Sequence, residues 1–129
     1  MVTVNSTRPI NLNLFRLRFP VMAIASILHR ISGVIIFLFL PFLLYLLHQS
    51  LISQERYDSL ASFIHEPGVQ LLLIIIFAAV TYHSLAGLRH LLMDMGFGES
   101  LSMGRSSAYL IIILAVILTF LFGAWLWLS

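Results

Sequence analysis

Residues 31–47 read ISGVIIFLFLPFLLYLL and contain no Asp, Glu, His, Lys or Arg. A bilayer core of about 30 Å needs roughly 20 helical residues to cross it. This run, with the apolar residues before it, is long enough to do so. Pro41 would count against a helix in water, but membrane helices tolerate proline as a kink. The stretch therefore predicts a first transmembrane helix over residues 21–47.

Two further segments have the same character. Residues 68–93 form a second apolar run, which is interrupted by His83, Arg89 and His90. Residues 106–128 carry no charge and end in WLWL, so Trp125 and Trp127 can anchor this third span at the membrane interface. Each span must be helical, because an open strand would leave backbone groups unpaired in lipid. The expected fold is an all-α membrane protein with three transmembrane helices.

Composition supports a membrane protein. The chain has 129 residues, of which 60% are hydrophobic and 9% are charged, whereas soluble domains carry about 25% charged residues. There is no cysteine, which excludes disulfides, zinc–thiolate sites and cysteine-ligated iron–sulfur clusters. The net charge of +2 comes from arginines that lie beside apolar runs. They form no polar, aromatic-laced face, so we expect a lipid bilayer and no nucleic acid as the partner.

The arginines also predict the orientation in the membrane. Arg8, Arg16, Arg18 and Arg30 flank the start of the first span, and Arg89 and Arg105 flank the second connection. Arg56 alone lies in the first connection, residues 48–67, which is expected to be a polar, acidic loop. The positive-inside rule then predicts a bacterial inner-membrane protein with a cytoplasmic N-terminus and a periplasmic C-terminus. We expect residues 1–20 to be a cytoplasmic leader, not a cleaved signal peptide, and residues 21–129 to be one membrane domain.

One face of the second span carries candidate cofactor residues. At about 100° per residue, a single stripe contains Ala79, His83, Gly87, His90 and Asp94. A neutral imidazole in the membrane interior can bind haem iron as an axial ligand, and a glycine one turn on leaves room for a flat macrocycle. His90 lies near where a haem propionate could reach, and Arg89 is expected to add positive charge there. The alternatives are that His83 only bonds a neighbouring helix and that the residues near the span end contact lipid headgroups.

The start of the first span carries a second constellation, formed by Ser26, His29, Arg30 and Gly33 within one arc of the helix. A hydroxyl and a guanidinium on one face can donate hydrogen bonds to a carbonyl and stabilise a reduced, partly anionic oxygen. A lipid-soluble quinone fits such a site. Contact with lipid headgroups would explain Arg30 alone, but it does not require the other three residues to share its face.

These motifs resemble a known family. SILHRISG at residues 26–33 and HSLAGLRHLLMD at residues 83–94 are similar to the cytochrome b membrane-anchor subunit of succinate dehydrogenase, respiratory complex II. The leader sequences RPINLNL and RFP resemble the proteobacterial branch. The resemblance implies that the three helices form half of a heterodimeric, haem-binding helical bundle. A second, smaller membrane-anchor subunit would supply the other half and the second axial histidine.

The resemblance also implies roles for individual residues. His83 matches the axial ligand of haem b, and Ser26 and Arg30 match residues that line the ubiquinone site. His29, Arg30 and His90 match positions around the haem propionates. The family's flavoprotein subunit oxidises succinate, and its iron–sulfur subunit passes the electrons to the membrane. This chain would then dock those subunits and would hold no catalytic residue for succinate oxidation.

Two alternatives stay open at this stage. The chain could be the b-type cytochrome anchor of another quinone oxidoreductase, such as fumarate reductase or a formate dehydrogenase. Such anchors usually have either more haem histidines in one chain or none, and a single mid-span histidine argues against them. A non-redox membrane protein, for example a small transporter subunit, is the other alternative, and it predicts no haem absorption.

Overall fold

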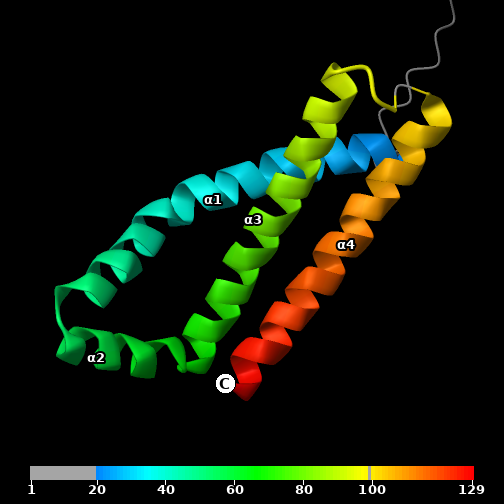
Figure 1. Ribbon diagram of the computed structural model, residues 1–129. Coiled ribbons are helices and arrows are strands. Elements are labelled where there is room, and N and C mark those ends of the chain that lie inside the picture. The colour runs from blue at the N-terminus through cyan, green and yellow to red at the C-terminus, as the bar shows by residue number, and fades with distance from the viewer. Residues whose placement is uncertain (1–19, 99) are drawn as a thin grey trace, which may run out of the picture.

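The computed structural model describes residues 20–98 and 100–129, and in this part of the chain every regular element is a helix. In chain order the helices are α1 (Val21–Ile52), α2 (Gln54–Ile64), α3 (Pro67–Asp94) and α4 (Leu101–Leu128). Figure 1 shows α3 and α4 running antiparallel, side by side, while α1 crosses them near one end and diverges toward the other. The short helix α2 leads from the end of α1 back to the start of α3.

Three of these helices, α1, α3 and α4, are long and apolar enough to cross a membrane. This confirms the predicted all-α membrane fold with three spans. Large apolar side chains point outward along the spans, and Phe37 and Phe120 are about three-quarters exposed. A surface of this kind is stable only against lipid or another apolar protein surface. The predicted leader falls almost entirely outside the described residues.

The first connection differs from expectation, because part of the predicted loop is the helix α2. Ser53 caps this helix by accepting a hydrogen bond from the backbone N–H of Arg56 at 3.3 Å. Glu55 in the first turn places a negative charge beside the free N–H groups at the helix start. The connection is thus polar, as expected, but it is helical.

The turn between α3 and α4 has an identifiable cause. Gly96 has a φ of 85°, the left-handed conformation that glycine adopts at a helix end. The N–H of Gly96 bonds to the Met93 carbonyl, and that of Phe97 bonds to the Leu92 carbonyl, both at 2.9 Å. This pair of bonds is a Schellman motif. Ser100 then caps α4 through the N–H of Met103.

The three spans pack through small residues. The buried cluster where they meet contains Ala25 of α1, Tyr82 and Ala86 of α3, and Ala108, Ile111 and Ala115 of α4. Alanine at these positions lets helix backbones approach closely, which is how membrane helices gain packing energy without a hydrophobic driving force between them. The crossing of α1 and α3 lies beside this cluster, and it positions the site described next.

Candidate functional site

Three imidazoles lie together where α1 crosses α3. The rings of His29 and His83 are stacked, with centroids 4.1 Å apart and planes within 14° of parallel. The ring centroid of His90 lies 5.2 Å from that of His29, and the two planes are tilted by 57°. His29 comes from α1, and the other two come from one face of α3. The structure therefore brings together the histidines of both sequence motifs.

The hydrogen bonds of His83 indicate which of its nitrogens is free. Its Nδ1 lies 3.1 Å from the carbonyl oxygen of His29 and 3.2 Å from Ser32 Oγ. Because a carbonyl oxygen can only accept, the 3.1 Å contact is a hydrogen bond in the tautomer whose Nδ1 carries the proton and donates to the His29 carbonyl. Nε2 of the neutral ring then keeps its lone pair. Metal-binding histidines are commonly oriented in this way, with the second ring nitrogen bonded to a backbone carbonyl.

Two glycines leave room for these rings. A Cβ atom at Gly33 would lie 3.0 Å from Cε1 of His83, closer than packed carbon atoms normally approach. A Cβ atom at Gly87 would lie 3.7 Å from Nε2 of His29, which is ordinary contact. Of the two, Gly33 is the one that His83 requires. The room that Gly87 was expected to leave is taken up, in this structure, by the ring of His29.

One ring nitrogen of the cluster lacks a partner. Within the described part of the chain, Nε2 of His29 is buried and makes no hydrogen bond. Burying an unpaired polar atom costs about 1–3 kcal/mol. The geometry therefore points to a polar partner from outside the described residues, next to the stacked His29 and His83 rings.

The candidate quinone residues lie on α1, one turn apart. Ser26 is half-buried, and Arg30 is exposed. Arg30 directly follows His29, so its side chain leaves α1 about 100° around the helix from that imidazole. Because Arg30 is exposed, the N–H donors of its guanidinium are available to a group bound against α1.

The side chain of Arg89 is directed to α4. Its positive charge was expected at the same level of the span as His90, and its hydrogen bonds show which neighbouring helix it faces at that level. Nε donates to Ser107 Oγ at 2.9 Å, and Nη2 donates to the Gly104 carbonyl at 3.1 Å. The physical reason is the helical period, because neighbouring residues leave a helix about 100° apart. His90 faces α1, and Arg89 therefore faces α4.

Ser32 and Tyr82 were not singled out from the sequence, yet both shape the site. Ser32 Oγ donates to the His29 carbonyl at 2.8 Å, and the Tyr82 hydroxyl donates to the Ala25 carbonyl at 2.8 Å. The two accepting carbonyls lie one turn apart on α1. The Tyr82 bond runs from α3 to α1 and helps to hold the two helices in register, whereas the Ser32 bond lies within α1. The sequence did contain a signal for both residues, because each carries a hydroxyl group within an apolar span and lies close to a motif histidine.

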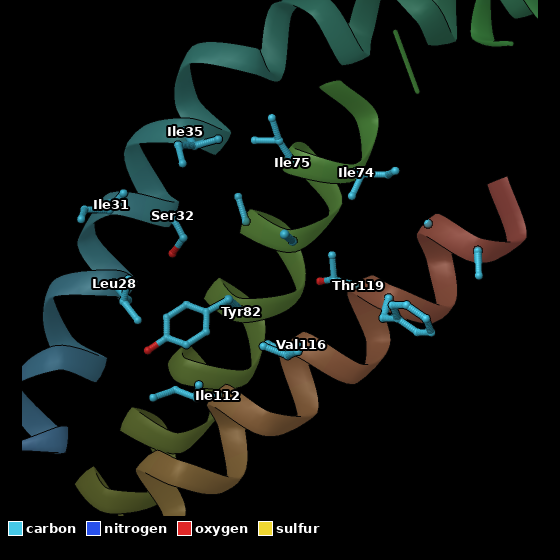
Figure 2. Close-up of a pocket in the computed structure, with 16 residues that line it drawn as sticks. Leu28, Ile31, Ser32, Ile35, Ile74, Ile75, Tyr82, Ile112, Val116 and Thr119 are labelled. Atoms are coloured by element: carbon cyan, nitrogen blue, oxygen red, sulfur yellow. The ribbon is translucent and has the colours of Figure 1, made fainter. Parts of the chain in front are cut away.

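A cavity of about 780 Å³ opens between the three spans. Figure 2 shows Ser32 and Tyr82 reaching into it from α1 and α3, and Ile112, Val116 and Thr119 lining it from α4. Its walls are otherwise aliphatic or small, and no histidine lines it. The cavity suits an apolar group and is distinct from the imidazole cluster.

Comparisons with known proteins agree with these features. Residues 4–122 match the family model described as succinate dehydrogenase/fumarate reductase transmembrane subunit. A succinate dehydrogenase cytochrome b556 subunit from Coxiella burnetii is 43% identical over 125 residues, which cover 96% of this chain and all of that protein. A protein of the same name from Rickettsia felis is 27% identical over 118 residues, covering 92% of each chain.

Proposed function

The chain belongs to the succinate dehydrogenase/fumarate reductase transmembrane-subunit family, and from that membership we propose that it anchors a succinate dehydrogenase, shares the ligation of haem b and lines the ubiquinone-reduction site. Both relatives are named as cytochrome b556 subunits of succinate dehydrogenase, which favours that enzyme over fumarate reductase. The chain works as one subunit of an enzyme complex, and succinate is oxidised elsewhere in that complex.

The hydrogen bond between His83 Nδ1 and the His29 carbonyl is the observation that carries the haem proposal. It would orient the ring so that Nε2 could bind the iron, and the smaller anchor subunit would supply a second histidine. When bound, haem b supplies one-electron redox chemistry. The contact with Ser32 Oγ adds a second restraint on the same ring.

The residues around His83 fit a haem in a further respect. Haem carries two propionate carboxylates, and the unpartnered Nε2 of His29 is a buried atom that needs a polar partner. The other candidates are His90, whose ring lies near that of His29, and the exposed Arg30, the next residue along α1. These three side chains would hold the carboxylates by hydrogen bonds and charge.

Ser26 and Arg30 are proposed to bind ubiquinone. Their hydroxyl and guanidinium groups would orient a quinone carbonyl by hydrogen bonds and stabilise the negative charge that develops on its oxygen during reduction.

The proposed setting is a bacterial inner membrane with the N-terminus in the cytoplasm. The start of α1, the end of α3 and the start of α4 lie at one end of the bundle (Figure 1). That end holds Arg30, Arg89 and Arg105, whereas Arg56 is at the other. Arg8, Arg16 and Arg18 lie outside the described residues. The iron–sulfur and flavoprotein subunits would dock on the arginine-rich side.

The quinone part of this proposal is tested by Arg30→Leu in the whole complex. We expect succinate oxidation by a soluble dye to stay near the wild-type rate, because that reaction does not use the membrane site. Ubiquinone reduction should fall about 10- to 100-fold, the effect of losing a hydrogen bond to a charged group. Arg56→Leu, at the opposite end of the spans, is the control and should change neither rate. An Arg30→Leu complex that reduces ubiquinone at the wild-type rate would remove Arg30 from the site.

A further inference from the structure

A second cavity lies between α3 and α4, and neither the haem nor the quinone proposal uses it. Its volume is about 330 Å³. Leu85, Leu88 and Leu92 line it from α3, and Leu110 and Leu114 line it from α4. Arg89 is the charged residue in this otherwise mostly apolar lining. The cavity thus combines one cation with walls that suit a hydrocarbon chain.

Arg89 is an unusual residue to find there, because its side chain is only 8% exposed. The two groups that accept hydrogen bonds from it, Ser107 Oγ and the Gly104 carbonyl, are both neutral. A guanidinium has five N–H donors, and these two bonds use one donor on each of two nitrogens. Charged groups inside membrane proteins are costly and are normally paired. The site is therefore complementary to an anion.

The cavity lies away from the proposed redox groups. Around α3, at 100° per residue, Leu85, Leu88 and Leu92 are roughly 140–200° from His83. This face of α3 is therefore directed away from the imidazole cluster and from α1. A subunit that completes the proposed haem site would approach the imidazole side, which is a different face of α3 from this groove.

Arg89 also lies close to one end of its span. It lies five residues before the end of α3, or about 7.5 Å along the axis. The exposed Arg105 lies one residue after Gly104 at the start of α4. Basic pockets between membrane helices near the cytoplasmic surface are suited to anionic headgroups.

We propose that this groove binds an anionic phospholipid. Its phosphate would accept hydrogen bonds from the remaining donors of Arg89, and one acyl chain would lie along Leu110 and Leu114. The lipid would then be an integral part of the α3–α4 hairpin. This proposal is independent of the roles given to His83, Ser26 and Arg30.

The test uses the full-length chain in its purified, delipidated complex. Phosphatidylglycerol, phosphatidylcholine with the same acyl chains, and inorganic phosphate are titrated separately, and binding is followed by native mass spectrometry. We expect phosphatidylglycerol to bind more tightly than the other two. Arg89→Gln should weaken its binding about fivefold, the contribution of one arginine near an anionic headgroup.

A second variant leaves Arg89 in place. Leu114→Trp fills the groove where the acyl chain would lie and should also weaken phosphatidylglycerol binding. Leu121→Trp adds the same side chain to an exposed position of α4 outside the groove, and it should bind like wild type. If the Arg89→Gln complex does not assemble, the proposal is tested by comparing phosphatidylglycerol binding between Leu114→Trp and Leu121→Trp. Equal affinity in wild type and Leu114→Trp would overturn the proposal, as would inorganic phosphate binding as tightly as the lipid.

Discussion

His83 is held by two groups of α1, the carbonyl of His29 and the hydroxyl of Ser32. Neither needs to touch a ligand, yet together they orient the ring and leave Nε2 as its free nitrogen. In metal sites the loss of such a supporting partner typically lowers affinity about 10- to 100-fold. The proposed ligand therefore depends on the register between α1 and α3 as well as on the histidine itself.

Gly33→Ala tests this dependence at a single residue. The new Cβ would lie 3.0 Å from Cε1 of His83, and the stacked ring of His29 limits how far His83 can move away. Overpacking of this kind costs about 1–3 kcal/mol. We expect a lower ratio of haem to protein in the purified complex, measured by a pyridine haemochrome assay.

Gly68→Ala is the matched control, because a Cβ at Gly68 would meet no atom within 4 Å. Its haem content should equal that of wild type. If the Gly33→Ala complex also kept its full haem content, haem binding would not depend on the position that His83 has in this structure.

Arg89 and His90 show where sequence reasoning stops. The 3.6-residue period correctly predicts that His83 and His90 share a face of α3. It cannot say which neighbouring helix covers each face, because that depends on packing among all three spans. The sequence therefore predicted only the level of the Arg89 charge along the span, and the hydrogen bonds of Arg89 show that it faces α4.

At the level of the helices, α3 and α4 are joined by polar contacts at both ends. Arg89 bonds to Ser107 and Gly104 at one end. At the other, Gln70 is buried, and its Nε2 donates to the Leu126 carbonyl at 3.1 Å. Leu126 lies in the last turn of α4, where carbonyls have no partner within the helix. This contact gives α4, a span with no sequence motif of its own, a fixed position against α3.

Gln70→Leu removes that second contact, and the Leu126 carbonyl then keeps only the bond from Ser129 Oγ. Hydrogen bonds between membrane helices are worth about 0.6 kcal/mol on average and up to about 1.7 kcal/mol. We expect the complex to unfold at a lower temperature in detergent, as measured by differential scanning fluorimetry. Gln54→Leu changes an exposed glutamine of α2, whose bond to Asp58 is exposed as well, and should leave the melting temperature unchanged. Equal melting temperatures for both variants would contradict the proposed role of Gln70.

The long spans were predictable, and α2 was not, for a physical reason. Seventeen residues without a charge inside residues 31–47 leave few options other than a helix in lipid. In the connection after it, the helical signal is short, and it consists of a serine cap at Ser53 and an acidic first turn at Glu55. A prediction based mainly on hydropathy misses a helix of this kind, because its residues are polar and charged.

At the scale of the whole molecule, the described arginines are unevenly distributed between the two ends of the bundle. Arg30, Arg89 and Arg105 belong to one end, and Arg56 belongs to the other (Figure 1). The positive-inside rule assigns the first end to the cytoplasm. The quinone residues, the proposed lipid site and the docking side for the soluble subunits would then all face the same compartment.

Topology can be tested directly because the chain has no cysteine. Ser59→Cys on α2 and Ser102→Cys on α4 each introduce one thiol at an exposed position, at opposite ends of the bundle. We expect a membrane-impermeant maleimide to label Ser59→Cys in intact cells and Ser102→Cys only in inverted vesicles. The reverse pattern would contradict the predicted orientation.

The central claim is that His83 binds haem iron at the crossing of α1 and α3. It is tested by the reduced-minus-oxidised absorption spectrum of the purified complex carrying His83→Leu, with His48→Leu, an exposed histidine near the end of α1, as the control. The account predicts a b-type spectrum in wild type and in His48→Leu, and its loss or a clear shift in His83→Leu while the subunits still co-purify. An unchanged b-type spectrum in His83→Leu would contradict it.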